Sequence, residues 1–355
     1  MTAAMGSAPT QLDSRLLEDI RAHAGALDRG EYHSRRSFVA LGSAALLGVG
    51  APGNADGRLP EMADVIRLIS AECMSTGFSL WAHRMTVEYL LTAATPFSNA
   101  AATPLLAGTA LGVSGMAATQ KEVTGCGSLE LTATPVAGGY EISGPIRWAS
   151  NLYTDSIMVT GVRTDDGERL IIAVPLDTLG IEVGDPFDLL AMGSTASSYV
   201  HMTAAYVPAE QVLSRDLKGF LQAVRPTMLI LQSAMCLGLT RTCVDQSRLG
   251  LAGTTAVLRP DLDRIAGGLA QAEATLAAVA AAVGGARPPT TKDLLSLRLS
   301  AGELVSASAD LELRTAGGNG YATRTSTSRH YREAAFVPVQ SPSEAQLRWE
   351  LSRCA

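Results

Sequence analysis

The first 112 residues place apolar side chains at steps of three and four, which is the spacing of amphipathic helices. One such series runs through residues 12–30 and another through residues 59–91. A Ser-Thr-Gly stretch at 75–77 is expected to interrupt the second series. The pattern therefore predicts an N-terminal α-helical domain over residues 1–112.

The period changes after residue 112, because apolar and polar residues alternate through most of residues 113–212. Alternation is typical of half-buried strands, and a glycine-containing pair between two alternating runs indicates a β-hairpin. Residues 129–150 contain such a pair at 138–139, and residues 156–176 contain another at 166–167. The sequence predicts a middle β domain, a barrel or a sandwich, over residues 113–212.

The helical period returns over residues 213–355. Long apolar-periodic segments cover residues 225–249, 261–283 and 290–316, and glycine or proline pairs end the last two. The order α, then β, then α predicts an α+β fold whose C-terminal domain is a helical bundle. A doubly wound nucleotide fold is disfavoured, since the chain has neither a G-x-G-x-x-G after a strand nor a P-loop.

Residues 34–53 resemble a twin-arginine export signal, with two arginines followed by small apolar residues. The segment before them is acidic, with five Asp or Glu against three Arg between positions 13 and 31, whereas an export signal needs a basic start. We therefore favour a core helix over residues 34–50, with Ser34 as its N-cap.

Composition narrows the class of protein. The chain has 355 residues and a net charge of −6, which argues against nucleic-acid binding. No apolar run approaches the roughly 18 residues of a membrane-spanning helix. The five cysteines include no C-x-x-C pair, so a metal site is not expected and a reducing, cytoplasmic location fits best.

Five stretches in chain order resemble the acyl-CoA dehydrogenase family of flavoproteins. They are residues 27–66, "GMAATQK" at 115–121, "SGPIRWASN" at 143–151, "AAYVPAEQVL" at 204–213 and "AGGNGYATRTSTSRHYREAAF" at 316–336. Each motif is weak by itself, but their order and spacing cover nearly the whole chain. The resemblance implies the family's fold, in which FAD lies between a β domain and a C-terminal helical domain.

The resemblance also implies roles for particular residues. Trp148 would pack against the isoalloxazine and Ser150 would hydrogen-bond the flavin edge. Thr119 matches the flavin loop, and Gly317 and Gly318 match glycines that let the backbone approach the ADP portion of FAD. Singly, each has a structural alternative, namely a core Trp, a capping Ser or a helix C-cap.

The family's catalytic base has no carboxylate counterpart in this chain. A base must lie within hydrogen-bond reach of the proton that it removes from the acyl thioester. The resemblance places it at Gln340 or at Ser341, depending on the alignment, and the alternative position on the long C-terminal helix falls near Met228. Glu344 is the nearest carboxylate, but a solvated or structural role suits it better.

Other family features are also altered. Gln120 and Lys121 stand where the flavin loop has Glu and Pro, and residues 249–265 lack the family's Arg-x-x-Phe-Gly stretch, which reaches the FAD of a neighbouring subunit. These changes bear on FAD affinity and on the usual tetramer. Arg225, Arg241 and His83 could shape a substrate pocket, although a partly buried Arg is more often an ion-pair partner.

Three functions remain open. The first is FAD-dependent α,β-dehydrogenation of an acyl thioester, linked to CoA or to an acyl-carrier protein, with hydride transfer to flavin and an unrecognised base or a pre-acidified substrate. The second is a flavin-dependent monooxygenase of the same fold, which would use O2. The third is a non-catalytic subunit of a paired dehydrogenase. The expected partners are the acyl carrier, an electron-transfer protein or O2, and further subunits in a homo- or hetero-oligomer.

Overall fold

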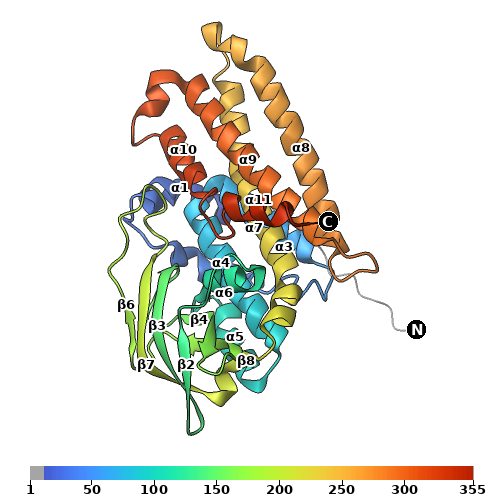
Figure 1. Cartoon of the computed structure of the whole chain (residues 1–355). Helices are drawn as coiled ribbons and strands as arrows, with labels where there is room; N and C mark the ends of the chain where they lie inside the picture. Colours follow the sequence, from blue (N-terminus) through green and yellow to red (C-terminus); the bar gives the residue numbers. More distant parts are fainter. Residues whose placement is uncertain (1–11, 355) are drawn as a thin grey trace, which may run out of the picture.

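The computed structural model describes residues 12–354 and confirms the α, β, α order of the chain. In Figure 1 the strands form a layer beside a central group of helices, and the C-terminal helices rise from that group as a tall column. The first eleven residues of the predicted N-terminal domain lie outside the described part. The helices within the predicted N-terminal domain are α1 (Ser14–Asp28), α2 (Phe38–Ser43), α3 (Leu59–Glu72), α4 (Met74–Ala93) and α5 (Pro96–Leu106).

Helix α4 is the central helix of the core. Every residue from Met74 to Leu90 is buried, so the helix has no polar face and is surrounded by other elements. Most of its polar side chains have partners inside the protein, although the Ser75 and Thr76 hydroxyls have none among the described residues. One such partnership is the fully buried pair of Arg84 and Glu88, whose nearest atoms are 2.8 Å apart.

The expected helix break at 75–77 is wrong by a few residues. Cys73 separates α3 from α4 with an extended backbone, and the Ser-Thr-Gly stretch forms the first turn of α4. Gly77 is there for a packing reason, because a Cβ at this position would lie 2.0 Å from the Oγ of Ser70 on α3. The glycine thus permits the close approach of two helices and does not end either of them.

The single helix expected over residues 34–50 is also wrong. The structure has a 3-10 turn, η1 (Ser34–Ser37), then the short α2, and turns from Ala44 onward. The Ser34 hydroxyl does not cap a helix. It lies 2.7 Å from the Ser79 Oγ and donates to the Ser194 carbonyl. Ala45 has a positive φ of 54°, which ends helical geometry in this Ala-rich segment.

Within residues 12–354, eight strands form one mixed sheet in the order β6-β7-β3-β2-β4-β5-β8, with β1 paired to β4. Both predicted hairpins are confirmed: β2 pairs with β3 and β4 pairs with β5, each antiparallel. The bounds are β1 (Gly112–Gly115), β2 (Thr132–Val136), β3 (Gly139–Ala149), β4 (Ile157–Thr164), β5 (Arg169–Pro175), β6 (Ile181–Val183), β7 (Ser198–Pro208) and β8 (Val212–Ser214). Helix α6 (Ala117–Thr124) follows β1.

Strands β4 and β5 are buried on both faces. Met158 and Val162 belong to a core within the β layer, whereas Val159 between them belongs to the large helical core. The same alternation holds for Ile172 and Ile171 on β5. Since successive strand residues point to opposite faces, these two strands join the β layer to the helices.

One of the C-terminal helices begins earlier than the sequence indicates. Helix α7 (Leu217–Leu249) begins well before the expected residue 225, because the Asp216 side chain caps it by accepting from the Gly219 N–H at 2.9 Å, and Pro226 is contained within it. Helices α8 (Arg259–Ala282) and α9 (Thr291–Ala316) match their predicted segments closely. The remaining elements are η2 (Ala209–Gln211), η3 (Gly253–Leu258), η4 (Gly317–Tyr321), α10 (Ser326–Phe336) and α11 (Glu344–Leu351).

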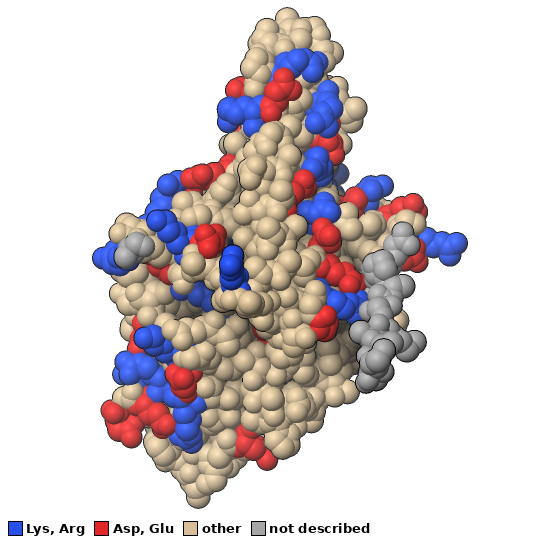
Figure 2. All heavy atoms as spheres, turned by 90° about the vertical axis from the view of Figure 1, so that its right-hand side faces the viewer, with Lys and Arg blue, Asp and Glu red and all other residues tan. Residues whose placement is uncertain are grey.

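By length and composition alone, two segments could cross a membrane, contrary to the expectation from the sequence. The first, α7, is mostly buried inside the protein, as a core helix is. The second runs from Gly253 to Ala282, includes α8, and is only partly buried, with Leu262, Ile265, Leu269 and Leu276 inside the protein. On the face shown in Figure 2, basic and acidic side chains are interspersed along the helical column.

Candidate functional site

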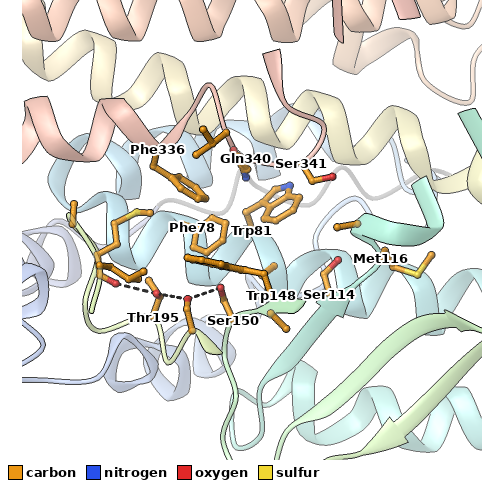
Figure 3. Close-up of a pocket in the computed structure, with 18 of the residues that line it drawn as sticks. Phe78, Trp81, Ser114, Met116, Trp148, Ser150, Thr195, Phe336, Gln340 and Ser341 are labelled. Carbon is orange, nitrogen blue, oxygen red and sulfur yellow. Dashed lines mark hydrogen bonds between the residues drawn. The ribbon is translucent and has the colours of Figure 1, made fainter. Parts of the chain in front are cut away.

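A cavity of about 510 Å³ lies where the β layer, α4, α6, α7 and α10 meet. This is within the range of small-molecule sites, which are mostly apolar and carry a few polar groups. Figure 3 shows that its walls come from segments far apart in the sequence, with Trp81 on α4, Trp148 on β3 and Gln340 after α10.

Trp148 forms part of one wall. The residue is 49% exposed and lies between the exposed Arg147 and the buried Ala149 at the end of β3. The indole contacts Phe187 with ring centroids 4.4 Å apart, and the cavity opens beside it. A half-exposed indole in a cavity is a flat apolar surface that another flat ring can cover.

A row of hydroxyl groups lines the cavity beside Trp148. The Ser150 Oγ lies 2.7 Å from the Ser197 Oγ, which is 2.8 Å from the Thr195 Oγ1. Thr195 in turn donates to the Met192 carbonyl at 2.9 Å. Since Thr195 uses its proton in this way, Ser197 donates to Thr195 and Ser150 donates to Ser197. The row can therefore only accept further hydrogen bonds from a bound molecule.

Three aromatic rings form the opposite part of the cavity. Phe78 stacks on Trp81 with centroids 5.7 Å apart, and Phe336 meets Phe78 edge-on at 5.0 Å. The Trp81 Nε1–H donates to the Met228 carbonyl on α7 at 3.4 Å. These contacts fix the rings that a bound apolar group would meet.

The remaining residues proposed as flavin contacts lie elsewhere. Thr119 is fully buried, and its hydroxyl accepts from the Gly161 N–H at 3.1 Å instead of facing the cavity. Gly317 and Gly318 are exposed at the far end of α9, where a Cβ would meet nothing within 4 Å. Of the five predicted residues, the structure brings Trp148 and Ser150 together at the cavity.

All three positions at which the resemblance places a base line the cavity, namely Gln340, Ser341 and Met228. Among the residues that the structure describes, no Asp or Glu lines it. Glu344 lies outside the cavity and pairs with Arg348 at 2.8 Å. Glu333 is buried on α10 but also outside the lining, and burial raises the pKa of its carboxyl.

Two cationic side chains reach the cavity, Lys121 and Arg332. Arg332 is neutralised by Asp28, with Nη2 and Oδ2 2.6 Å apart. Lys121 forms no ion pair within residues 12–354. The cavity therefore has positive and neutral polar groups, and it suits a ligand that carries oxygen acceptors or negative charge.

The other polar residues considered from the sequence have structural partners. Arg225 pairs with Glu350 at 2.6 Å, and Arg241 pairs with Glu273 at 2.5 Å. His83 is buried and hydrogen-bonded to backbone groups of α5 and β1. The sequence reasoning missed Thr195 and Ser197, since they lie in a loop whose composition carries no motif.

A second polar cluster lies in the helical column, away from the cavity. One ligand-type atom each from Cys243, Glu312 and His330 lies within 4.8 Å of the others, and all three residues are buried. The His330 Nδ1 is 3.0 Å from the Glu312 carboxylate, and its Nε2 faces the Arg329 guanidinium at 3.0 Å. Arginine can only donate, so the ring proton is on Nδ1 and is donated to Glu312.

Comparisons with known proteins agree with this architecture, although no family model matches the chain. The chain is 24% identical over 357 residues to a probable acyl-CoA dehydrogenase, YngJ, of Bacillus subtilis, covering 93% of this chain and 92% of that protein. It superposes on the butyryl-CoA dehydrogenase of Megasphaera elsdenii with a TM-score of 0.85 at 15% identity, covering 97% and 98% of the two chains. A glutaryl-CoA dehydrogenase of Mycobacterium smegmatis in complex with FADH2 gives a TM-score of 0.83 at 14% identity, over 96% and 94%.

Proposed function

We propose that this chain, which is similar over nearly its whole length to acyl-CoA dehydrogenases, is an FAD-dependent oxidoreductase of that family that introduces an α,β double bond into an acyl thioester. The observation that carries the proposal is the cavity between the β layer and the C-terminal helices, with Trp148 exposed inside it. The acyl group is carried by CoA or by an acyl-carrier protein.

The residues of the cavity fit a flavin. Trp148 offers a flat apolar surface for the tricyclic ring, and the Ser150, Ser197 and Thr195 hydroxyls offer acceptors for an N–H on the polar edge of that ring, since their own protons are donated along the row to Met192. When bound, FAD supplies the oxidising power that an unassisted protein side chain lacks. The aromatic wall of Phe78, Trp81 and Phe336 would then hold the acyl chain and exclude water.

Dehydrogenation needs a group that accepts the proton from the α-carbon. No carboxylate among the described lining residues can do so. An α-proton of a thioester is weakly acidic, so the reaction needs a positioned base or a substrate of raised acidity. Gln340 and Ser341 can orient an acyl group by hydrogen bonding but cannot take the proton at neutral pH. The proposal therefore uses a base outside the lining or a pre-acidified substrate.

The test is the visible spectrum of the purified protein, followed by anaerobic titration with acyl thioesters. The protein is expected to carry a flavin spectrum, and the absorbance near 450 nm is expected to fall when a substrate thioester is added. A protein that binds FAD yet keeps the oxidised spectrum with every thioester contradicts dehydrogenation.

The carboxylate-free lining also favours a second candidate, a flavin-dependent monooxygenase of the same fold, because that reaction needs no carboxylate to remove the α-proton. Reduced flavin and O2 would then give product and consume O2. Absence of O2 consumption with reduced flavin excludes this candidate. If both tests fail while a complete homologue restores activity in a mixture, the chain is the non-catalytic subunit of a paired enzyme.

Replacing Trp148 by Ala is expected to weaken FAD binding about tenfold, because the flavin loses an aromatic face on which to stack. FAD affinity is measured by titrating the deflavinated protein and following flavin absorbance. Trp349→Ala is the matched control, since Trp349 contacts Arg353 on the surface at 3.8 Å and lies outside the cavity. Equal losses of affinity in both variants would contradict a stacking role for Trp148.

The proposal also covers the oligomeric state, the cellular location and the electron acceptor of the protein. The oligomer is proposed from the resemblance, since the large apolar side chains of α8 are buried within the single chain, namely Leu262, Ile265, Leu269 and Leu276. The five cysteines are all free, which supports a reducing, cytoplasmic location. The electron acceptor is an electron-transfer protein or O2. Sedimentation of the purified protein measures the oligomeric state directly.

A further inference from the structure

One wall of the cavity presents hydrogen-bond donors that nothing in the described chain uses. The Gln340 side chain is only 4% exposed, and its Nε2 has no hydrogen-bond partner among residues 12–354. The Ser341 Oγ is buried and equally without a partner in that part of the chain. Both residues line the cavity and lie next to each other in Figure 3. Other buried polar atoms also lack partners, such as the Ser75 Oγ and the Thr76 Oγ1, but the Gln340 and Ser341 groups line a cavity, where a bound molecule can supply the missing partner.

The orientation of the Gln340 amide is fixed from behind by Arg298. The Arg298 Nη2 donates to the Gln340 Oε1 at 3.3 Å and to the Val337 carbonyl at 3.2 Å. A guanidinium has no acceptor, so the amide oxygen must face Arg298 and the NH2 group must face away from it. Gln232 braces the same arrangement, since it accepts from the Arg298 Nε at 3.2 Å and donates to the Ser341 carbonyl at 2.9 Å.

Arg298 also places a positive charge behind this wall. It is 1% exposed and forms no ion pair with any acidic residue that the structure describes. A buried charge that lacks an opposite charge favours negative charge nearby. Lys121, which has no ion pair within residues 12–354, and the absence of a carboxylate from the described lining also favour negative charge in the cavity.

Resting on the proposed acyl-thioester chemistry, we propose that the acyl group carries its own oxygen acceptor, which Gln340 and Ser341 bind. The oxygen belongs to a hydroxyl, oxo or carboxylate group on the acyl chain, and a carboxylate gains most from the charge of Arg298. A plain hydrocarbon chain would bury the two donors without partners, and sites built to bond an oxygen reject analogues that lack it. Gln340 and Ser341 thus determine substrate class.

The experiment compares butyryl, 3-hydroxybutyryl, 3-oxobutyryl and succinyl thioesters of pantetheine, which share the same thioester. Binding to the FAD-loaded protein is measured by calorimetry and by the shift of the flavin spectrum. We expect at least one oxygen-bearing thioester to bind tenfold or more tightly than butyryl. Gln340→Leu should remove most of this preference, measured as the ratio of the oxygen-bearing to the butyryl affinity in FAD-loaded protein, and Ser341→Ala should reduce that ratio by a smaller factor.

Gln246→Leu is the matched control, since Gln246 is exposed on α7 and lies outside the cavity. Equal affinity for all four thioesters in the wild-type protein overturns the proposal. An equal loss of affinity for butyryl and for the other thioesters in Gln340→Leu also overturns it, because the two donors would then bind the shared thioester. Loss of FAD from the Gln340→Leu variant overturns it as well. Flavin reduction by butyryl with no preference for oxygen would sink this inference and leave the proposed function standing.

Discussion

Replacing Arg84 by Met is expected to lower the free energy of unfolding by about 3 to 5 kcal/mol, because it leaves Glu88 as a buried charge without its cation. Both side chains of this pair are fully buried on α4. Arg84 also donates twice to the Val49 carbonyl, at 3.1 and 3.3 Å. Met is close in length, so the loss reports the charge and the hydrogen bonds more than the packing.

Urea denaturation followed by circular dichroism measures this change. The double variant Arg84→Met/Glu88→Gln should recover part of the stability, because the amide keeps an acceptor for Gly53 N–H and Thr227 without the charge. Arg248→Met is the matched control, since the Arg248–Asp245 pair is half exposed and should contribute little. An unchanged midpoint in Arg84→Met would show that the pair does not stabilise the fold.

Acidification is expected to destabilise the protein through His83, by about 2 kcal/mol between pH 6.5 and pH 4.5. Burial lowers the pKa of this imidazole to about 3, against about 6.5 for an exposed histidine. The folded state therefore binds fewer protons than the unfolded state between these two pKa values. The stability is complete above pH 6.5 and is lost as the pH falls toward 3.

The variant His83→Gln isolates this contribution. The His83 Nδ1 accepts from the Gly112 N–H at 3.1 Å, so its Nε2 carries the proton and donates to the Leu105 carbonyl. Gln keeps one donor and one acceptor but does not titrate. The free energy of unfolding of the variant should fall less steeply with acid, by up to about 1.4 kcal/mol per pH unit. Parallel pH profiles for the two proteins would contradict the assignment.

The hairpins and the long C-terminal helices could be predicted because their signals are local. Glycine-containing turns and alternating residues define β2 to β5, and a threonine cap defines α9. The segment after residue 34 could not be predicted in the same way. Its Ala-rich composition favours a helix, but Gly42 lies so close to Ala107 that a Cβ would meet its carbonyl oxygen at 2.2 Å. Such tertiary approaches leave no periodic trace in the sequence.

The candidate site was predictable only where a motif lies on a strand that reaches the cavity. Trp148 and Ser150 lie at the end of β3, and the structure places both at the cavity. The sequence singles out Gln340 as a position that lacks a carboxylate, but it gives no hint that Arg298 orients its amide. That contact joins residues 42 positions apart in sequence, on α9 and after α10.

The burial of α4 decides which wall of the cavity can vary. Phe78 and Trp81 belong to the most enclosed helix, so a larger or smaller ring there disturbs neighbours on several sides. Across the cavity, Ala335 and Val339 are exposed, so substitutions there need no repacking of the core. A descendant of this protein that adapts to a new ligand would accumulate its changes on the α10 side first and keep the α4 side as inherited.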